Sequence, residues 1–389
     1  MAFPDKPVAQ LLGANGPIHT VAYSASPGTY ILTGGADRSI RLYNPAPTTA
    51  VHPAPSYITV RQQQQQQQQQ DPGPQHAGGG AEAPVPAGRL IQTFSAHGYE
   101  VLSLAVAADN ARFVSAGGDR AAFLWDVASG TTLRRFGGGG AGTGHASRIN
   151  AVAFAGEGDS LVATGGFDTT VRVWDTRGGG AGRPVAVLSG AGDSVTAVAV
   201  RGAEVVAGSV DGRVRSYDVR MGRVTTDVVG ASVTSLCLAR DGKSALVGSL
   251  DSKVRLMDRE TGACLRTYAE PAWRNAELRI QSVLGGGERF VVAGDELTAA
   301  GGGSATGGVG VAAEGRIWAW DLLSGKLVAR VRVPWGPGGS DGRKRVVGRD
   351  GKEKERKNVV SCIAWKEDGY GDQFCAGGTS GVVTVFGSG

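Results

Sequence analysis

Residues 117–126 read GGDRAAFLWD, and residues 165–175 read GGFDTTVRVWD. In each stretch a turn acid, Asp119 or Asp168, is followed seven positions later by an aspartate that ends a short apolar strand. Five looser copies keep the spacing: Asp37 to Asn44, Asp211 to Asp218, Asp251 to Asp258, Glu314 to Asp321, and Ser380 to Gly387. One supersecondary unit repeated at one spacing predicts a repeat architecture rather than several independent domains.

The unit around Asp119 predicts four short strands. Residues 101–106 and 112–115 precede the acidic turn, residues 121–125 and 132–136 follow it, and Gly, Asp, Asn or Ser lies between them. Strands rich in Val, Leu and aromatic residues between such turns are typical of antiparallel sheet. A sheet of about 40 residues buries neither face alone, whereas copies stacked around an axis cover both. The sequence therefore predicts an all-β fold, a seven-bladed β-propeller, as a single domain over residues 1–389.

The two ends of the chain predict how the ring closes. The last unit ends at the apolar segment 382–386, which is only its third strand, and the first unit is preceded by an extra apolar strand at 8–12. Pairing these segments would complete the last blade and remove two exposed strand edges, which promote aggregation. We expect the N-terminal strand to close the propeller in this way.

Three insertions interrupt the repeat, at residues 46–89, 299–312 and 335–357. Without them the units average about 44 residues, the length of a propeller blade. Residues 46–89 combine Pro-rich stretches, nine consecutive glutamines and a glycine run, a composition that predicts a disordered loop. This loop is either a partner-recruiting tract or a tolerated surface expansion. Residues 299–312 form a Gly-rich insertion.

The insertion at 335–357 is basic. Residues 343–357 contain eight basic and three acidic residues, so this segment accounts for the whole net charge of +5. A nucleic-acid-binding face would spread its charge over a folded surface, so we expect no sequence-specific nucleic-acid binding. The segment predicts either a nuclear-import or acidic-partner patch or a solvated loop.

Two neighbouring units each combine a hydroxyl, a histidine and an acid. The sets are His97, Ser115, Asp119 and Trp125, and then His145, Thr164, Asp168 and Trp174. Such groups form nucleophile triads in hydrolases. Here each set lies within one unit, recurs in the next and ends in a strand tryptophan, which favours a buried hydrogen-bonded chain that supports the fold. The other five units lack the histidine.

No other pattern predicts catalysis. Residues 139–144 have the glycine spacing of a phosphate loop but lack the lysine that should follow, and the glycines of 308–313 precede a strand rather than a helix. The four cysteines form no C-x-x-C pair, and we expect them to be reduced and mostly buried. We expect no enzyme activity, cofactor, metal or small-molecule substrate, and neither a secretory signal nor a membrane span.

Several stretches resemble a known family. A Gly-His dipeptide at 144–145 and Trp-Asp dipeptides at 125–126 and 174–175 are typical of WD-repeat propellers. Residues 95–104 (SAHGYEVLSL), 207–222 (AGSVDGRVRSYDVRMG) and 249–262 (SLDSKVRLMDRETG) resemble the WD-repeat family of the mitogen-activated protein kinase organizer, WD repeat-containing protein 83. The resemblance covers the first five units well and the last two loosely, and the three insertions depart from it.

This resemblance implies a scaffold without catalysis. Members of the family are linked to the MAP-kinase cascade and to the catalytic-stage spliceosome, so the implied partners are MAP-kinase cascade components and spliceosomal factors. The implied location is the nucleus and cytoplasm, with no role for a membrane. The basic insertion favours a nuclear, splicing-associated role.

Two arginines raise an alternative. The stretches WDTR at 174–177 and YDVR at 217–220 place Arg177 and Arg220 just after the third strand of their units. In WD-repeat proteins that resemble substrate receptors of ubiquitin ligases, such an arginine docks the cullin-4 adaptor. An Asp-x-Arg sequence also caps ordinary turns through a local salt bridge, so both interpretations stay open.

Overall fold

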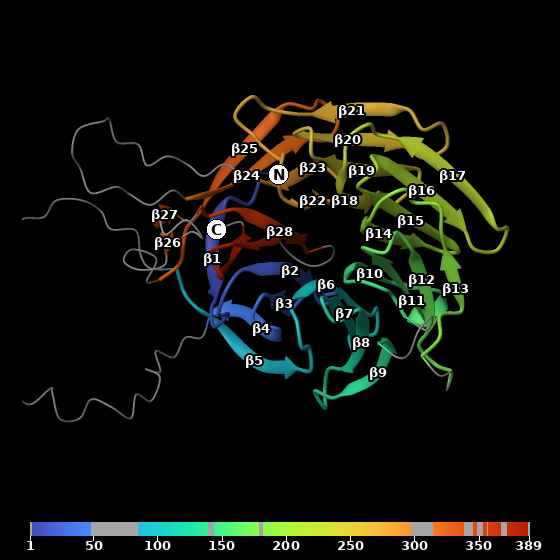
Figure 1. Ribbon diagram of the computed structural model, residues 1–389. Coiled ribbons are helices and arrows are strands. Elements are labelled where there is room, and N and C mark those ends of the chain that lie inside the picture. Colours follow the sequence, from blue (N-terminus) through green and yellow to red (C-terminus); the bar gives the residue numbers. More distant parts are fainter. Residues whose placement is uncertain are drawn as a thin grey trace, which may run out of the picture.

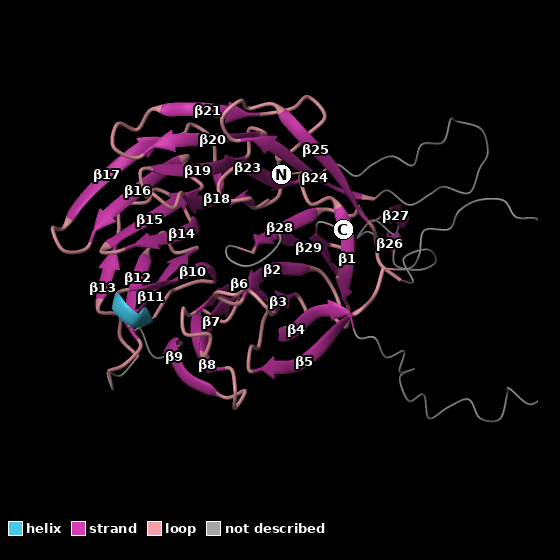
Figure 2. Cartoon of the chain, turned by 180° about the vertical axis from the view of Figure 1, so that it is seen from behind, coloured by secondary structure: helices cyan, strands magenta, loops and turns pink. Residues whose placement is uncertain are grey.

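Seven four-stranded antiparallel sheets surround a central channel in the computed structural model (Figure 1), and the view from behind shows the same closed ring (Figure 2). The structure describes residues 2–47, 85–138, 144–178, 182–296, 314–337, 345–347, 353–355, 357–366 and 372–387. Within these ranges the single helical element is a 3-10 turn at Glu157–Asp159. The predicted all-β propeller of seven blades is confirmed.

In blades one to six the strands follow one another from the channel outwards in chain order, whereas blade seven takes β1 as its outermost strand (Figure 1). The innermost strands of blades one to seven are β2 (Ile18–Tyr23), β6 (Val101–Val106), β10 (Ile149–Ala155), β14 (Val195–Arg201), β18 (Val233–Leu238), β22 (Ser282–Gly285) and β28 (Val360–Trp365). The second strands are β3 (Ile31–Gly35), β7 (Arg112–Gly117), β11 (Leu161–Gly166), β15 (Glu204–Ser209), β19 (Ser244–Ser249), β23 (Phe290–Gly294) and β29 (Gln373–Gly378).

The third strands end in the acid or amide that the repeat predicts, except in blade seven. They are β4 (Ser39–Pro47), β8 (Ala121–Asp126), β12 (Val171–Asp175), β16 (Arg213–Asp218), β20 (Lys253–Asp258), β24 (Gly315–Asp321) and β30 (Val383–Gly387); β4 runs three residues past its Asn44. The outermost strands are β5 (Gly88–Ser95), β9 (Thr132–Gly137), β13 (Ala186–Leu188), β17 (Arg223–Val228), β21 (Cys264–Tyr268), β25 (Leu327–Val333) and β1 (Lys6–Leu11).

The hydrophobic core consists of layers between blades. Seven clusters of buried apolar side chains occupy the seven interfaces between neighbouring blades. Successive side chains of a strand point to opposite faces of the sheet, so Phe113 packs towards blade one and Val114 towards blade three. Each blade therefore covers both of its faces with its two neighbours, which is why a unit too small to fold alone is stable in the ring.

The ring closes through β1, as predicted. Strand β1 pairs antiparallel with β30, with Leu11 opposite Val383. Phe3 precedes this strand and packs against aromatic rings of two blades. Its ring centroid lies 5.3 Å from that of Phe290 in blade six and 5.5 Å from that of Phe374 in blade seven. The N-terminal segment therefore seals the interface between blades six and seven in addition to completing blade seven.

The insertions differ from prediction at their ends. Strand β4 continues to Pro47 and β5 begins at Gly88, so both ends of the predicted insertion 46–89 belong to a lengthened hairpin. Residues 48–84 and the predicted insertion 299–312 lie outside the described residues. Within the basic insertion, Trp335 is buried and strands β26 (Arg345–Val347) and β27 (Glu353–Glu355) pair as a hairpin.

Candidate functional site

In blade two the predicted set forms one hydrogen-bonded chain. Trp125 Nε1 donates to Ser115 Oγ over 2.8 Å, and this oxygen lies 2.7 Å from His97 Nε2. His97 Nδ1 lies 2.5 Å from Asp119 Oδ2. The other carboxylate oxygen accepts the backbone N–H of Gly98 at 2.8 Å. Asp119 thus joins the loop that enters the blade to the turn between β7 and β8.

The donors of this chain decide where its protons lie. Trp125 can only donate a hydrogen bond, and a carboxylate such as that of Asp119 can only accept one. Every group is satisfied when His97 is neutral with its proton on Nδ1 and Ser115 donates to Nε2. Burial lowers the pKa of His97 more than the hydrogen bond to Asp119 raises it, which favours the neutral ring.

The order serine, histidine, aspartate matches a nucleophile triad, but the hydroxyl is out of reach. Ser115 is 0% exposed, and the indole N–H of Trp125 occupies its oxygen. A catalytic nucleophile must contact its substrate. The geometry is that of a structural chain in which each buried polar group is bonded to the next.

Blade three repeats the chain with a threonine. Trp174 Nε1 donates to Thr164 Oγ1 over 2.8 Å, His145 Nε2 lies 2.8 Å from that oxygen, and His145 Nδ1 lies 2.9 Å from Asp168 Oδ1. Burial raises the pKa of Asp168, but hydrogen bonds from His145 and from the backbone of Ala146 outweigh it and hold the pKa well below its usual value. Thr164 is 0% exposed, so this hydroxyl is also shielded.

Blades four and five hold the turn acid with an arginine that was not predicted. Arg215 Nη2 donates to Asp211 Oδ2 over 2.7 Å, and Nη1 donates to Ser209 Oγ over 2.9 Å. Burial raises the pKa of Asp211, but hydrogen bonds from Arg215 and Ser209 outweigh it and lower the pKa to about 2. The corresponding set in blade five is Ser249, Asp251 and Arg255.

Blade one uses the same solution without the serine. Arg41 Nη2 lies 2.7 Å from Asp37 Oδ2, and the carboxylate also accepts the backbone N–H of Asn15, in the loop that enters the blade. The signal for these sets was present in the sequence, since an arginine follows the turn acid by four positions in blades one, three, four and five.

In blade six the predicted turn acid is wrong. The seven-residue spacing assigned Glu314 as its turn acid, but the structure places Asp295 in that role. Asp295 Oδ2 accepts the indole N–H of Trp318 at 2.7 Å, and Oδ1 accepts the backbone N–H of Arg274 at 3.2 Å. Glu314 comes 19 residues after Asp295 in the sequence and directly precedes β24. The spacing was therefore matched by a residue on the wrong side of the insertion.

Arg177 and Arg220 lie on the turns after β12 and β16, in adjacent blades. Arg177 Nε lies 3.7 Å from Asp175 Oδ1, and its side chain is 72% exposed. The backbone N–H of Arg220 donates to Asp218 Oδ1 over 2.9 Å. Both positions therefore show the local Asp-x-Arg turn, and both arginine side chains remain accessible.

An apolar cavity lies between the same two blades. Its volume is about 440 Å³, and Leu161, Val173, Val200 and Val219 contribute to its lining. Arg220 lies at its edge. The cavity opens to the surface beside the buried cluster of this interface, which includes Val195, Val205 and Tyr217.

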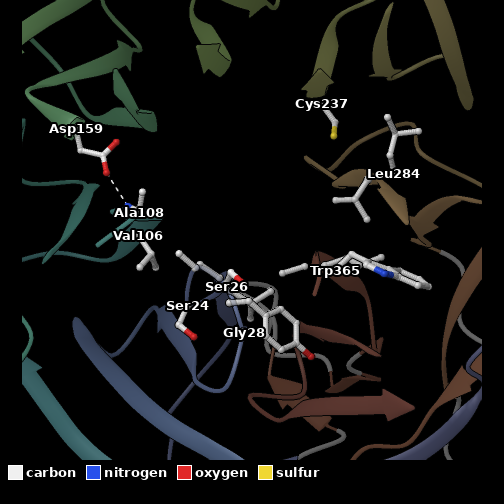
Figure 3. Close-up of a pocket in the computed structure, with 16 residues that line it drawn as sticks. Ser24, Ser26, Gly28, Val106, Ala108, Asp159, Cys237, Leu284 and Trp365 are labelled. Carbon is white, nitrogen blue, oxygen red and sulfur yellow. Dashed lines mark hydrogen bonds between the residues drawn. The ribbon is translucent and has the colours of Figure 1, made fainter. Parts of the chain in front are cut away.

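The central channel opens into a larger cavity where the inner strands end, which we call the wide mouth. Its volume is about 650 Å³. Figure 3 shows Ser24, Ser26, Leu284 and Trp365 around this space. At its edge Asp159 Oδ2 accepts the backbone N–H of Ala108 at 2.6 Å, which ties blade three to blade two (Figure 3). Apolar and polar side chains are mixed here, as at protein-binding surfaces.

The rim of the disc carries exposed apolar side chains. They lie on the outermost strands, which have no further strand beside them: Leu90, Ile91, Leu133, Val187, Val224, Val228, Leu265, Leu327 and Val328. Each is at least 41% exposed. They are spread over the outer strands of blades one to six, with one or two on each strand.

Other expected features are found as follows. All four cysteines are thiols, but the expectation that most are buried holds only for Cys362 and Cys375, since Cys237 is partly buried and Cys264 exposed. The outer strand β21 places Cys264 on the rim, which the sequence did not indicate. Within the described ranges, no helix is long and apolar enough to span a membrane. Nor do the described His, Cys, Asp and Glu side chains form a group of three that could hold a metal ion.

Comparisons with known proteins agree with this architecture. The WD domain, G-beta repeat family matches residues 5–44, 88–126 and 140–175. The first two ranges begin close to the starts of the outermost strands β1 and β5 and end in the third strands β4 and β8, whereas the third range begins after β9 and ends with β12. In the first two ranges the sequence repeat is therefore offset by one strand from the structural blade, and the same offset lets β1 close the ring.

Three curated relatives illustrate the range of similarity. WD repeat domain-containing protein 83 from Rattus norvegicus is 37% identical over 150 residues, which are 39% of this chain and 42% of the rat protein. Its homolog from Dictyostelium discoideum is 24% identical over 345 residues, 82% of this chain and 85% of the homolog. Autophagy-related protein 16 from Arabidopsis thaliana is 25% identical over 253 residues, 64% of this chain and 45% of that protein.

The closed ring of seven blades makes this chain a β-propeller, in which residues 5–44, 88–126 and 140–175 match the WD domain, G-beta repeat family. Within that class it is similar to WD repeat domain-containing protein 83, and the resemblance predicted from the sequence is confirmed. The aligned segment spans less than half of the rat protein.

Proposed function

We propose that this chain is a non-catalytic scaffold that holds proteins together in multiprotein assemblies. One observation carries the proposal. The side chains that resemble a triad, such as Ser115 and Thr164, are buried and bonded inside their blades, whereas the cavities and the outer strands face outwards. WD-repeat propellers typically present such surfaces to proteins.

The assemblies proposed are those of spliceosomal factors and of MAP-kinase cascade components, in the nucleus and cytoplasm. The support is the similarity to WD repeat domain-containing protein 83 and what the family resemblance implies. The net charge of +5 within residues 343–357 favours the nuclear, splicing-associated assembly over the kinase cascade.

Affinity purification of the tagged full chain, followed by mass spectrometry, tests this proposal. We expect spliceosomal proteins to dominate the recovered set, with kinase-cascade components as the second group. The purified chain alone should show no hydrolytic turnover. Recovery of neither group, or a hydrolase activity that resides in the purified chain, would contradict the scaffold function.

A second candidate is a substrate receptor of a cullin-4 ubiquitin ligase. The observation in its favour is that Arg177 and Arg220 are exposed on adjacent blades, with Arg220 beside an apolar cavity. This candidate requires that Arg177→Ala with Arg220→Ala abolishes binding to the purified cullin-4 adaptor without loss of folding. The scaffold proposal predicts that the double variant recovers the same proteins as the wild type.

A further inference from the structure

The channel has a second opening where the inner strands begin, which we call the narrow mouth. All inner strands run in the same direction because each blade repeats the same order of strands, so the narrow and wide mouths lie on opposite faces of the disc. The cavity at the narrow mouth has a volume of about 250 Å³. Its lining includes His19, Leu102, Arg279, Gln281 and Ser361, from blades one, two, six and seven.

Arg279 reaches across the ring at this mouth. It precedes β22 of blade six, and its Nη1 donates to the backbone carbonyl of Asn150, in β10 of blade three, over 2.6 Å. Blades three and six are not neighbours, so the side chain crosses the channel. A guanidinium has five N–H donors, and this is the one hydrogen bond that Arg279 makes to the described residues. Its Nε is shielded from solvent and has no acceptor among them.

The charge of Arg279 has no carboxylate partner among the described residues. Burial lowers its pKa to about 10, and the charge of nearby Arg148 adds to this. Arg148 itself lies over the ring of Phe167, at 4.9 Å from its centroid. A second cation therefore lies near Arg279, while Arg148 itself is exposed and does not line the cavity.

Two acids lie against residues that line this cavity, and neither pairs with Arg279. Glu100 Oε2 lies 3.4 Å from His19 Nε2. Burial lowers the pKa of His19, so this ring adds little positive charge near pH 7, and the Glu100 side chain is 42% exposed to solvent. The carboxylate of Glu296 accepts the backbone N–H groups of residues 276–278. The guanidinium at the narrow mouth therefore has no ion-pair partner among the described residues.

We propose that the narrow mouth binds a single carboxylate side chain from an acidic segment of a partner protein, with Arg279 as its counter-ion. The proposal rests on the scaffold function and assigns one partner chemistry to it. Arginine pairs with carboxylates through charge-assisted hydrogen bonds, which strengthen where water is excluded. A volume of about 250 Å³ is below the range of small-molecule pockets but accommodates one side chain of a docked peptide.

Fluorescence anisotropy with a labelled hexaglutamate peptide and the purified full chain tests the site. We expect binding that Arg279→Gln weakens at least tenfold. Arg274→Gln is the matched control, since Arg274 lies in the same loop, is 52% exposed and pairs with Glu277. We expect the peptide affinity of this control to stay within twofold of that of the wild type when both are measured at the same salt concentration. Equal binding by Arg279→Gln, or no binding at 1 mM peptide, would overturn the proposal.

A second pair of variants covers the case in which Arg279→Gln fails to fold. Leu102→Glu places a carboxylate inside the cavity, so we expect it to raise the melting temperature and to abolish peptide binding. Leu102→Gln has nearly the same size without the charge, and it should bind hexaglutamate within threefold of the wild type. Equal loss in both variants would contradict the proposal.

The anion itself is tested with a hexaphosphoserine peptide and with inorganic phosphate. We expect hexaglutamate to bind the wild type at least as tightly as either. Tighter binding of the phosphorylated peptide that is lost in Arg279→Gln would overturn the assignment of a carboxylate. If the peptide arms fail while affinity purification still recovers splicing or kinase-cascade proteins, the scaffold function stands and the narrow mouth does not serve it.

Discussion

Blades two and three hold their turn acid with a histidine, whereas blades four and five hold it with an arginine. The histidine comes from the loop before the blade, and His97 is 22 residues from Asp119. The arginine comes from the following strand, and Arg215 is four residues from Asp211. The histidine sets therefore join segments that are distant in the chain, while the arginine sets mainly reinforce one hairpin. The turn acid can thus be bound by either residue type, and the histidine connects it to a more distant part of the chain than the arginine does.

Blade three combines both, because Arg172 Nη2 also lies 3.8 Å from Asp168 Oδ2, but the position two residues before the turn acid differs between blade three and blades four and five. Blade three has Gly166 two residues before the turn acid, and a Cβ there would come within 2.4 Å of His145 Nδ1 and of Asp168 Oδ1. Blades four and five have Ser209 and Ser249 at this position, each with its hydroxyl bonded to the acid. In blade three the glycine leaves room for the imidazole of His145, whereas in blades four and five a serine hydroxyl bonds to the turn acid at this position.

The largest difference between the two pairs of blades is expected at the last apolar residue of the third strand. Trp174 is 1% exposed and donates to Thr164, whereas Met257 in blade five is 6% exposed and serves only to pack. We expect Trp174→Ala to lower the free energy of unfolding by about 4 kcal/mol and Met257→Ala by about 2 kcal/mol, measured by chemical denaturation. Equal losses would show that the network of blade three adds nothing to packing.

The difference between Gly166 in blade three and Ser209 in blade four predicts a smaller effect on the free energy of unfolding. Gly166→Ser forces a side chain against His145, so we expect a loss of about 2 kcal/mol in the free energy of unfolding. Ser209→Gly removes a hydrogen bond and adds backbone freedom, with an expected loss of about 1 kcal/mol. Adding His145→Ala to Gly166→Ser should cost less than the sum of the two single losses. If the two single losses simply add in the double variant, the side chain introduced by Gly166→Ser does not clash with His145.

The smallest expected effect is a difference in pH dependence. The pKa of His97 is lowered below its ordinary value of about 6.5. Below that pH the unfolded chain binds a proton that the folded chain does not, so stability falls as the pH decreases through about 6.5. The lowered pKa of His19 acts in the same direction. By contrast, the pKa of Asp211 is about 2, so its contribution is lost only as the pH falls below about 4 towards 2.

Melting temperatures between pH 7.5 and pH 5 measure this difference. We expect His97→Gln to reduce the dependence, because glutamine can bond to both Ser115 and Asp119 but does not titrate. Arg215→Lys should leave the dependence unchanged in this range. A slope that is the same in His97→Gln as in the wild type would show that His97 does not titrate with folding.

The sequence predicted the fold better than it predicted the polar sets. Seven units and the closing strand follow from apolar periodicity and turn residues, which act locally. The sets of blades two and three were predictable because histidine, hydroxyl and acid recur together. The arginine sets were missed because an Asp-to-Arg spacing of four residues, as in Asp251 and Arg255, is equally typical of a solvated strand.

Two features of the polar contacts depend on the three-dimensional path of the chain and not on local sequence. The turn acid of blade six was misassigned to Glu314 because an insertion separates Asp295 from its strand. The contact of Arg279 with Asn150 joins residues 129 positions apart on non-neighbouring blades. No local pattern marks such a contact, since it depends on the diameter of the closed ring.

The central claim is that the acids and hydroxyls that resemble catalytic groups hold the blades together. The free energy of unfolding of Asp168→Ala, compared with that of Asp251→Ala by chemical denaturation, tests it most directly. Asp168 lies in the buried chain of blade three, so we expect its loss to cost about 3 kcal/mol. Asp251 is 28% exposed beside Arg255, so we expect a loss of about 1 kcal/mol. An Asp168→Ala protein as stable as the wild type would contradict the claim.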